Sequence, residues 1–325
     1  MTGFVSTGNL PAPEHVQEIV DAAYASFRLN GEGENSQVYP ALARVPPGLF
    51  GICVVGVDGG AYHAGDVDAQ FAIMSVAKPF VFALACQSKG PEMVRRHIGV
   101  NATGLPFNSP DAVTQSPDGR TNPMVNPGAI ATTSLVPGDT AEEKWKAILA
   151  ALSGFAGRTL SLDEEVYRSA AATNHNNREL AGLLASRGLI SCEPALAVDL
   201  YTRQSCLSVT SRDLAVMGAT LADGGVNPVT GLRVIDPILC HHVLAVMATA
   251  GLYEASGEWL YDVGLPAKSG IGGGIVTISP GKGGLGTFAP PLDVTGNSVK
   301  GQLAARFLSR QLGLDLFVSR PVADR

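Results

Sequence analysis

The chain has 325 residues, of which 46% are hydrophobic and 16% charged, with a mean hydropathy of +0.18. This composition is typical of a globular protein with a large interior and excludes a disordered or fibrous chain. The formal net charge is −6, no basic cluster exceeds the pair Arg95-Arg96, and no uninterrupted apolar run is long enough for a membrane span. Neither nucleic acid nor a membrane is therefore expected as a partner.

The first residues and the cysteines indicate the compartment. Residues 1–13 lack the basic and apolar regions of a secretory signal. The five cysteines are odd in number, scattered and mostly in apolar surroundings: Cys53, Cys86, Cys192, Cys206 and Cys240. We predict free, buried thiols in a reducing cytoplasm, and no disulfide framework.

The N-terminal part alternates helix and strand. An amphipathic helix is predicted over residues 14–27, followed by a polar loop over residues 30–37. The apolar run 50–57 predicts a strand, because it is short and closed by the turn residues Asp58-Gly59-Gly60. Residues 61–64 then return as a second strand.

The middle of the chain is predicted to be helical. Apolar positions recur at spacings of three and four residues between Gly and Pro interruptions. The predicted helices are 75–89, 141–153, 163–172, 178–187, 192–204, 211–222 and 235–250. A long loop rich in Pro, Asn and Gly is expected over residues 101–128, and loops of that length inside a domain are usually functional.

Strands return near the C-terminus. Residues 275–279 and 284–288 predict two strands joined by the turn Pro280-Gly281-Lys282-Gly283, with a last helix over residues 299–312. The predicted fold is α+β, with one antiparallel sheet built from both chain ends, the terminal helices packed on it and a mostly helical subdomain inserted. The predicted division assigns residues 1–70 and 265–325 to the α/β part and 71–264 to the helical part, forming a single functional domain, 1–325.

The pair Ser75 and Lys78 is the sharpest chemical signal. Residues three apart on a helix share one face, and Ser75 is predicted to open the helix, where free N–H groups favour a developing anion. A lysine among apolar side chains loses solvation, which disfavours its charge and makes it a usable base. Taken alone, the motif is weak, and a solvated lysine beside a capping serine is its default interpretation.

A second motif near the C-terminus supports the catalytic interpretation. Lys268-Ser269-Gly270 precedes three more glycines and a strand, and penicillin-recognising hydrolases combine Ser-x-x-Lys with a similar Lys-[Ser/Thr]-Gly. Glycines allow the backbone to approach a ligand, so an N–H group here is suited to an oxyanion hole. The alternative is a glycine-rich turn that enters an edge strand.

Several further blocks stand in an order that resembles the serine-dependent glutaminases. The resemblance covers nearly the whole chain and rests on residues 71–78, 122–129, 166–169 with 177–178, 214–228, 251–258, 263–270 and 296–301. It implies a β-lactamase-like fold and hydrolysis of the side-chain amide of L-glutamine to L-glutamate and ammonia. It also implies a homodimer or homotetramer.

The resemblance also implies a role for each matched residue. Ser75 is the expected nucleophile, Lys78 its base, and Tyr253 the group that passes a proton to the leaving ammonia. The expected substrate-binding residues are Asn126, Asn177, Tyr201 and, through its backbone N–H in the oxyanion hole, Ile271. Without the resemblance, the two tyrosines would be read as half-buried packing residues and the asparagines as turn residues.

Three departures from the family pattern concern substrate recognition. The family's glutamate for the substrate α-amino group is replaced by Ala170, and the residue before the nucleophile is Met74 where the family usually has Gln. The family's Tyr-x-Pro is shifted, because the chain reads Val38-Tyr39-Pro40. An unpaired ammonium in a pocket is costly, so Ala170 weakens glutamine binding or changes the preferred substrate. Glu164 and Glu165 are close in sequence, but their helical phase does not direct them to the pocket.

Competing hypotheses follow from these departures. The first is a glutaminase that hydrolyses L-glutamine through a Ser-Lys acyl-enzyme, with another carboxylate or bound waters in place of the missing glutamate. The second is an amidase or peptidase of the same fold with another substrate, and the third a non-catalytic amino-acid-binding homologue. A β-lactamase is the weakest, because the middle blocks favour a glutaminase. No nucleotide, flavin or metal motif is present, and the adjacent His241 and His242 diverge on a helix, so no cofactor is expected beside the small-molecule substrate.

Overall fold

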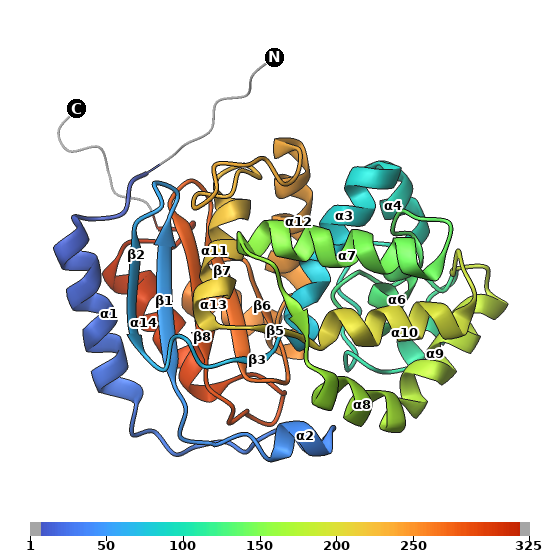
Figure 1. Ribbon diagram of the computed structural model, residues 1–325, viewed down its shortest axis with the longest axis horizontal. Helices are drawn as coiled ribbons and strands as arrows, with labels where there is room; N and C mark the ends of the chain where they lie inside the picture. The colour runs from blue at the N-terminus through green and yellow to red at the C-terminus, as the bar shows by residue number, and fades with distance from the viewer. Residues whose placement is uncertain (1–7, 319–325) are drawn as a thin grey trace.

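The computed structural model describes residues 8–318. Residues 1–7, part of the segment predicted not to be a secretory signal, and residues 319–325 lie outside the described residues. Figure 1 shows a sheet with helices on both faces at one side of the molecule and a group of helices at the other. The division of the chain at residues 70 and 265 stays a prediction.

A five-stranded antiparallel sheet is assembled from both ends of the chain, as predicted. Its strand order is β2-β1-β8-β7-β6. The strands are β1 Gly51–Gly56, β2 Ala61–Gly65, β6 Ala267–Ser269, β7 Gly274–Ser279 and β8 Gly283–Phe288. N-terminal β1 pairs with C-terminal β8, and Val54 lies opposite Leu285.

Strand β1 is buried on both faces, which explains its uninterrupted apolar run. Ile52 and Val54 join the core beneath α1, Pro13–Phe27, and α14, Val299–Gln311. Cys53 and Val55 face the opposite layer, where they pack with residues of α11, Ser211–Ala222. The sheet therefore lies between the two terminal helices and α11 (Figure 1).

Two glycines in β8 let α11 approach the sheet almost to backbone contact. A Cβ atom added to Gly286 would lie 2.0 Å from the Ser211 carbonyl oxygen. One added to Gly284 would lie 2.3 Å from the Ala215 carbonyl oxygen. No side chain fits at either position without moving the helix, so these glycines fix the depth at which α11 packs.

The helices between the two sheet-forming ends enclose a large apolar core of their own. They are α3 Lys78–Lys89, α4 Pro91–Ile98, α5 Asp111–Thr114, α6 Asn126–Ser134, α7 Ala141–Ala156, α8 Glu164–Thr173, α9 His175–Ser186, α10 Pro194–Ser205 and α12 Pro237–Ala250. The remaining short elements are α2 Pro40–Ala43, η1 Met74–Ala77, η2 Tyr253–Ala255, α13 Ser256–Val263 and the small sheet of β3 Phe71–Ala72, β5 Leu207–Val209 and β4 Ser161–Leu162.

Two predictions in this region need correction. The stretch 101–128 is not a continuous loop, because α5 forms within it and α6 begins at Asn126. Pro127 is compatible with this start, since a proline in the first turn removes an N–H that has no helical partner. Ser75 does not open its helix either: the 3₁₀ turn η1 begins one residue earlier, at Met74, and continues into α3.

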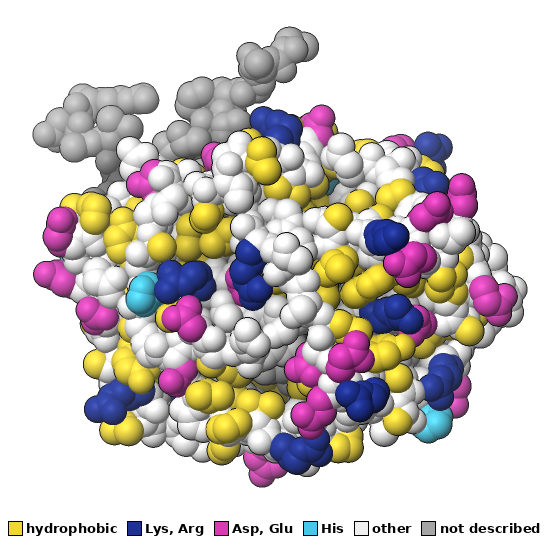
Figure 2. Space-filling model, in the orientation of Figure 1, with side chains coloured by type: hydrophobic (Ala, Val, Ile, Leu, Met, Phe, Trp, Pro, Cys, Tyr) yellow, Lys and Arg dark blue, Asp and Glu magenta, His cyan; other side chains and the backbone are white. Residues whose placement is uncertain are grey.

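Acidic and basic side chains alternate over the face drawn in Figure 2, without a large area of one sign. No single helix within residues 8–318 is long and apolar enough to cross a membrane, and α12 passes that test only jointly with residues 253–263, at a bend of 99°. All five cysteines are free and, except for Cys192, buried, as predicted.

Candidate active site

Ser75 lies in a short, strained segment at the start of a buried helix. It is the second residue of η1 and is 7% exposed. Met74, directly before it, has a φ of 49°, and Tyr253 has a φ of 56°; these are the two non-glycine residues with positive φ among residues 8–318. Such backbone strain costs on the order of 1–3 kcal/mol per residue and concentrates at functional sites.

Lys78 lies one turn further along, at the first residue of α3, and is 2% exposed. Its Nζ donates to the Met124 carbonyl oxygen at 3.1 Å and to Asn126 Oδ1 at 2.8 Å. Burial disfavours the ammonium form and lowers the pKa of Lys78 to about 7. Neither bond reaches Ser75, and catalytic contacts in free enzymes are often completed only when substrate binds.

A chain of hydrogen bonds leads outward from Lys78 through three buried asparagines. Asn126 Nδ2 donates to Asn177 Oδ1 at 3.0 Å, and Asn177 Nδ2 donates to Asn174 Oδ1. Asn174 Nδ2 then donates to Thr202 Oγ1 at 2.7 Å, and the Thr202 hydroxyl donates to the Val198 carbonyl oxygen at 2.7 Å. Every amide in the chain therefore has its oxygen on the side toward Lys78, which fixes the orientation of all three.

Two buried tyrosines border Ser75. Tyr201 donates its hydroxyl to Asn126 Oδ1 at 3.0 Å, and burial raises its pKa well above the ordinary value. Tyr253 donates to the Ser269 carbonyl oxygen at 3.3 Å, and burial raises its pKa to about 12 although hydrogen bonding to Ser75 opposes the shift. Both phenols therefore keep their protons at neutral pH.

The second predicted motif lies beside the first. Strand β6 carries Lys268, whose Nζ donates to the Ser269 carbonyl oxygen at 2.7 Å and lies 4.1 Å from the centre of the Tyr253 ring. Burial, and then the charge of Lys78, hold the pKa of Lys268 well below its ordinary value. A Cβ atom on Gly270 would lie 3.2 Å from the Ser75 nitrogen, so a glycine is needed where this strand meets η1. No backbone carbonyl among residues 8–318 accepts the N–H of the next residue, Ile271.

Most of the predicted site residues line one enclosed pocket of about 100 Å³. They are Ser75, Asn126, Asn177, Tyr201 and Ile271. Lys78 and Tyr253 do not line it, but they reach it through Asn126 and through Phe107, whose ring centre lies 4.4 Å from that of Tyr253. Tyr39 also lines the pocket, so its shifted position in the sequence does not remove it.

Ala170 lies in the wall of this pocket and is 1% exposed. As expected from helical phase, Glu164 and Glu165 of the same helix are exposed and do not line the pocket. Glu165 instead pairs with Arg44 at 2.5 Å. Neither glutamate therefore substitutes for a carboxylate at position 170.

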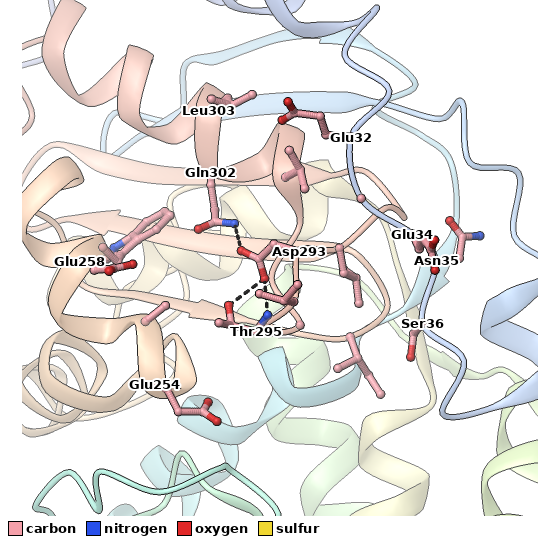
Figure 3. A pocket seen from close by; sticks show the side chains of 18 of the residues that line it. Glu32, Glu34, Asn35, Ser36, Glu254, Glu258, Asp293, Thr295, Gln302 and Leu303 are labelled. Carbon is pink, nitrogen blue, oxygen red and sulfur yellow. Dashed lines mark hydrogen bonds between the residues drawn. The ribbon is translucent and has the colours of Figure 1, made fainter.

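A larger cleft of about 1080 Å³ adjoins the pocket and shares Val38, Phe107 and Ile271 with it. Figure 3 shows its walls, on which Glu32, Glu254 and Glu258 are labelled. Asp293 accepts hydrogen bonds from Thr295 and Gln302 (Figure 3). No group of three or more metal-ligating side chains is found within residues 8–318.

Sequence reasoning did not find three residues at this site. Asn174 and Thr202 close the hydrogen-bonded asparagine chain, and Phe107 packs on Tyr253. Asn174 lies between the predicted helices 163–172 and 178–187, and this position between two helices was the one indication in the sequence of a structural role. Nothing in the local sequence predicts that Thr202 accepts a hydrogen bond from a distant side chain, because a threonine within a helix usually bonds only to the backbone of its own helix.

Comparisons with known proteins agree with this geometry. The model of the family described as Glutaminase matches residues 33–317. A relative named Glutaminase 2 from Yersinia pestis is 63% identical over 322 residues, which is 99% of this chain and 95% of that protein. A relative named Glutaminase from Brucella canis is 49% identical and covers 89% of this chain and 91% of its own length.

A solved structure is similar throughout its length. The protein described as probable glutaminase ybaS superimposes with a TM-score of 0.93 at 44% identity, covering 94% of this chain and 99% of that chain. The likeness confirms the predicted α+β fold of the β-lactamase-like type.

Proposed function

The chain belongs to the glutaminase family and hydrolyses the side-chain amide of L-glutamine to L-glutamate and ammonia, and we propose that it does so through an acyl-enzyme on Ser75. The observation that carries this mechanism is the buried Lys78, one helical turn after Ser75, with a pKa lowered to about 7. An amine that is partly neutral at physiological pH can take the proton of a serine hydroxyl.

The first step joins the substrate to the enzyme. Ser75 Oγ attacks the amide carbon while its proton passes to Lys78 Nζ. The carbonyl oxygen becomes an oxyanion, which the N–H groups of Ser75 and Ile271 stabilise. Donors that point to this oxygen before the reaction typically account for about a hundredfold or more in rate each.

The second step breaks the carbon–nitrogen bond. Tyr253 donates its proton to the departing nitrogen, so ammonia leaves, and Tyr253 recovers a proton from the lysine that accepted it. The high pKa of Tyr253, about 12, keeps the phenol protonated until this moment. An ester between Ser75 and the glutamyl group remains.

In the last step a water molecule attacks this ester and gives its proton to Lys78. The tetrahedral intermediate forms in the same oxyanion hole and collapses to L-glutamate as Lys78 returns the proton to the departing Ser75 Oγ, which restores both groups. The balance is one glutamine and one water consumed for one glutamate and one ammonia. These steps require no metal or cofactor.

Asn126, Asn177 and Tyr201 are proposed to hold the substrate. Their side chains line the pocket, and the asparagine chain fixes which face of each amide meets the ligand. Each asparagine nitrogen uses one N–H within that chain, which leaves the second N–H for the substrate carboxylate or amide oxygen.

The test is ammonia release from L-glutamine by the purified protein and its Ser75→Ala variant. Turnover that requires Ser75 is the expected result. A second arm quenches the wild-type protein with acid during its first turnovers at saturating L-glutamine and looks for a glutamyl group on the Ser75 peptide by mass spectrometry, with Ser75→Ala as the blank. Unchanged turnover in Ser75→Ala would contradict the mechanism while leaving the family membership intact.

We also propose that the protein assembles as a homodimer or homotetramer in the cytoplasm. The resemblance to the glutaminases and the reduced, mostly buried cysteines support this proposal. Light scattering on the purified protein and fractionation of cells test the two parts separately.

A further inference from the structure

The pocket above Ser75 contains no negative charge. Of the described residues that line it, none is an aspartate or a glutamate. One wall is apolar and belongs to a buried cluster that includes Met74, Ala170 and Cys206, against which Tyr39 and Ile271 pack. A charged ammonium placed against this wall would lose water and meet no counter-charge.

The buried amide oxygens of the pocket carry no formal charge and already accept hydrogen bonds within the protein. Asn126 Oδ1 accepts from both Lys78 and Tyr201. Asn177 Oδ1 accepts from Asn126, and Asn174 Oδ1 accepts from Asn177. Both lone pairs of Asn126 Oδ1 are used, and the other two oxygens keep one lone pair each. The asparagines therefore offer the ligand N–H donors and no negative charge, which suits a carboxylate or carbonyl oxygen better than an ammonium group.

Three carboxylates at the start of α8, within it and within α10 are committed elsewhere. Asp163 accepts from the backbone N–H groups of residues 165 and 166 as the cap of α8. Glu165 pairs with Arg44 on the surface. Asp199 accepts the Tyr167 hydroxyl and pairs with Arg203. None of these three lines the pocket.

We propose that this site accepts five-carbon ω-carboxamides whose α-carbon carries no ammonium, such as glutaramate, and prefers them to L-glutamine. The class comprises monoamides of dicarboxylic acids with a methylene or keto group at the α-position. The α-carboxylate is kept in this class, which matches the donors offered by the asparagines. The small cavity, about 100 Å³, limits the class to short molecules without a bulky α-substituent.

The chemistry is that of the proposed function, on which this inference rests. Ser75 attacks the carboxamide carbon, ammonia leaves, and water releases the dicarboxylate. Only the recognition of the α-position differs. Removing the ammonium removes the desolvation cost at the wall around Ala170, so binding in both the ground state and the transition state improves.

The experiment compares kcat/KM for glutaramate and L-glutamine in the wild-type protein, with Ser75→Ala as the blank. We expect a higher value for glutaramate, by about tenfold, because an unpaired polar group in a pocket discriminates at least that strongly. An equal or higher value for L-glutamine would overturn the proposal. It would leave the glutaminase mechanism standing, whereas no Ser75-dependent turnover of either substrate would remove both.

Two variants of position 170 test the cause. Ala170→Glu places a carboxylate at the wall and is expected to reverse the preference in favour of L-glutamine. The matched variant Ala170→Gln has nearly the same size without the charge and is expected to keep the wild-type order. Reversal by both variants, or by neither when both fold, would show that charge at this wall does not set the preference and would overturn the proposal. The wild-type comparison decides the matter if Ala170→Glu fails to fold.

Discussion

Lys78 Nζ donates a 2.8 Å hydrogen bond to Asn126 Oδ1, which also accepts the Tyr201 hydroxyl at 3.0 Å. One neutral oxygen thus positions the proposed base and a pocket tyrosine together. Because that oxygen carries no formal charge, it orients the lysine without returning its pKa to the ordinary value. A carboxylate of the same shape would orient the lysine and also stabilise its charged form.

Asn126→Asp is therefore expected to raise the pKa of Lys78 and to reduce activity at neutral pH. At any pH below the pKa of Lys78, each unit by which that pKa rises lowers the fraction of neutral lysine about tenfold. The acid limb of the kcat/KM profile should move to higher pH, and activity should partly return in alkaline buffer. Asn126→Ala is the control, since it removes the contact without adding charge and should lower activity without an upward shift. An identical midpoint in the wild type and Asn126→Asp would contradict the assignment of Lys78 as the base.

Lys78→Met is expected to abolish turnover while increasing the free energy of unfolding. The unfolded chain keeps this amine protonated up to its ordinary pKa of 10.5, whereas the folded protein does so only up to about 7. The unfolded state thus binds more protons between these values, so wild-type stability rises with pH across that window. The gain in the variant should be largest below pH 7, about 1–2 kcal/mol after loss of the lysine hydrogen bonds, and should shrink toward pH 10. Urea denaturation of the wild type and the variant near pH 7 and near pH 10 measures this difference in the free energy of unfolding. A difference that grows with pH would contradict the assignment of a lowered pKa to Lys78.

Gly270→Ala is expected to lower kcat by about a hundredfold with a smaller change in KM. The added Cβ would lie 3.0 Å from the Ile73 carbonyl oxygen and 3.2 Å from the Ser75 nitrogen, which displaces the proposed oxyanion hole. Gly257→Ala is the matched control, because nothing lies within 4 Å of its added Cβ on the exposed side of α13. Steady-state kinetics on both variants, with thermal unfolding to confirm the fold, decides the matter. Equal kinetics in the two would show that the strand does not supply the oxyanion contact.

Thr202→Val is expected to raise KM by about twofold to twelvefold, because one buried hydrogen bond contributes about 0.5–1.5 kcal/mol. Asn174 Nδ2 would lose its acceptor, and the amides of Asn177 and Asn126 would no longer have a fixed orientation. Thr202→Ser keeps the hydroxyl and should retain more activity than the valine variant. KM and kcat measured for both report the effect, and indistinguishable values would refute a positioning role for the threonine.

Local patterns were sufficient for the main elements of the fold. The unbroken apolar run of β1 and the Gly-rich turn after it predicted the hairpin, and 3.6-residue periodicity predicted helix α11 to the residue. The prediction that both chain ends contribute to one sheet is confirmed by the pairing of β1 with β8. These features depend on side-chain periods within one segment, which the sequence displays directly.

Other features depend on contacts between distant segments. Strands β3, β4 and β5 have two or three residues each, too few for a pattern to be visible. Helix α6 starts with Asn-Pro-Gly, a sequence typical of a turn, and it is helical here because the whole segment is buried against other helices.

The asparagine chain joins residues 126, 177, 174 and 202, and no spacing rule connects such positions. The glutaminase resemblance identified two of its members, Asn126 and Asn177, as binding residues, but their orientation follows from hydrogen bonds that form only in the folded chain.

The pairing of β1 with β8 has a consequence for biosynthesis. When the ribosome has made β1 and β2, only a two-stranded hairpin can form, and such hairpins are marginal in water. The partner strand of β1 arrives after most of the chain has been translated, so closing the sheet requires a contact of very high sequence separation. A chain that ends before β6 should therefore show no protected amides in β1 by hydrogen exchange. Until β8 emerges, β1 presents an open, apolar edge, at which the unfinished chain is exposed to pairing with other chains.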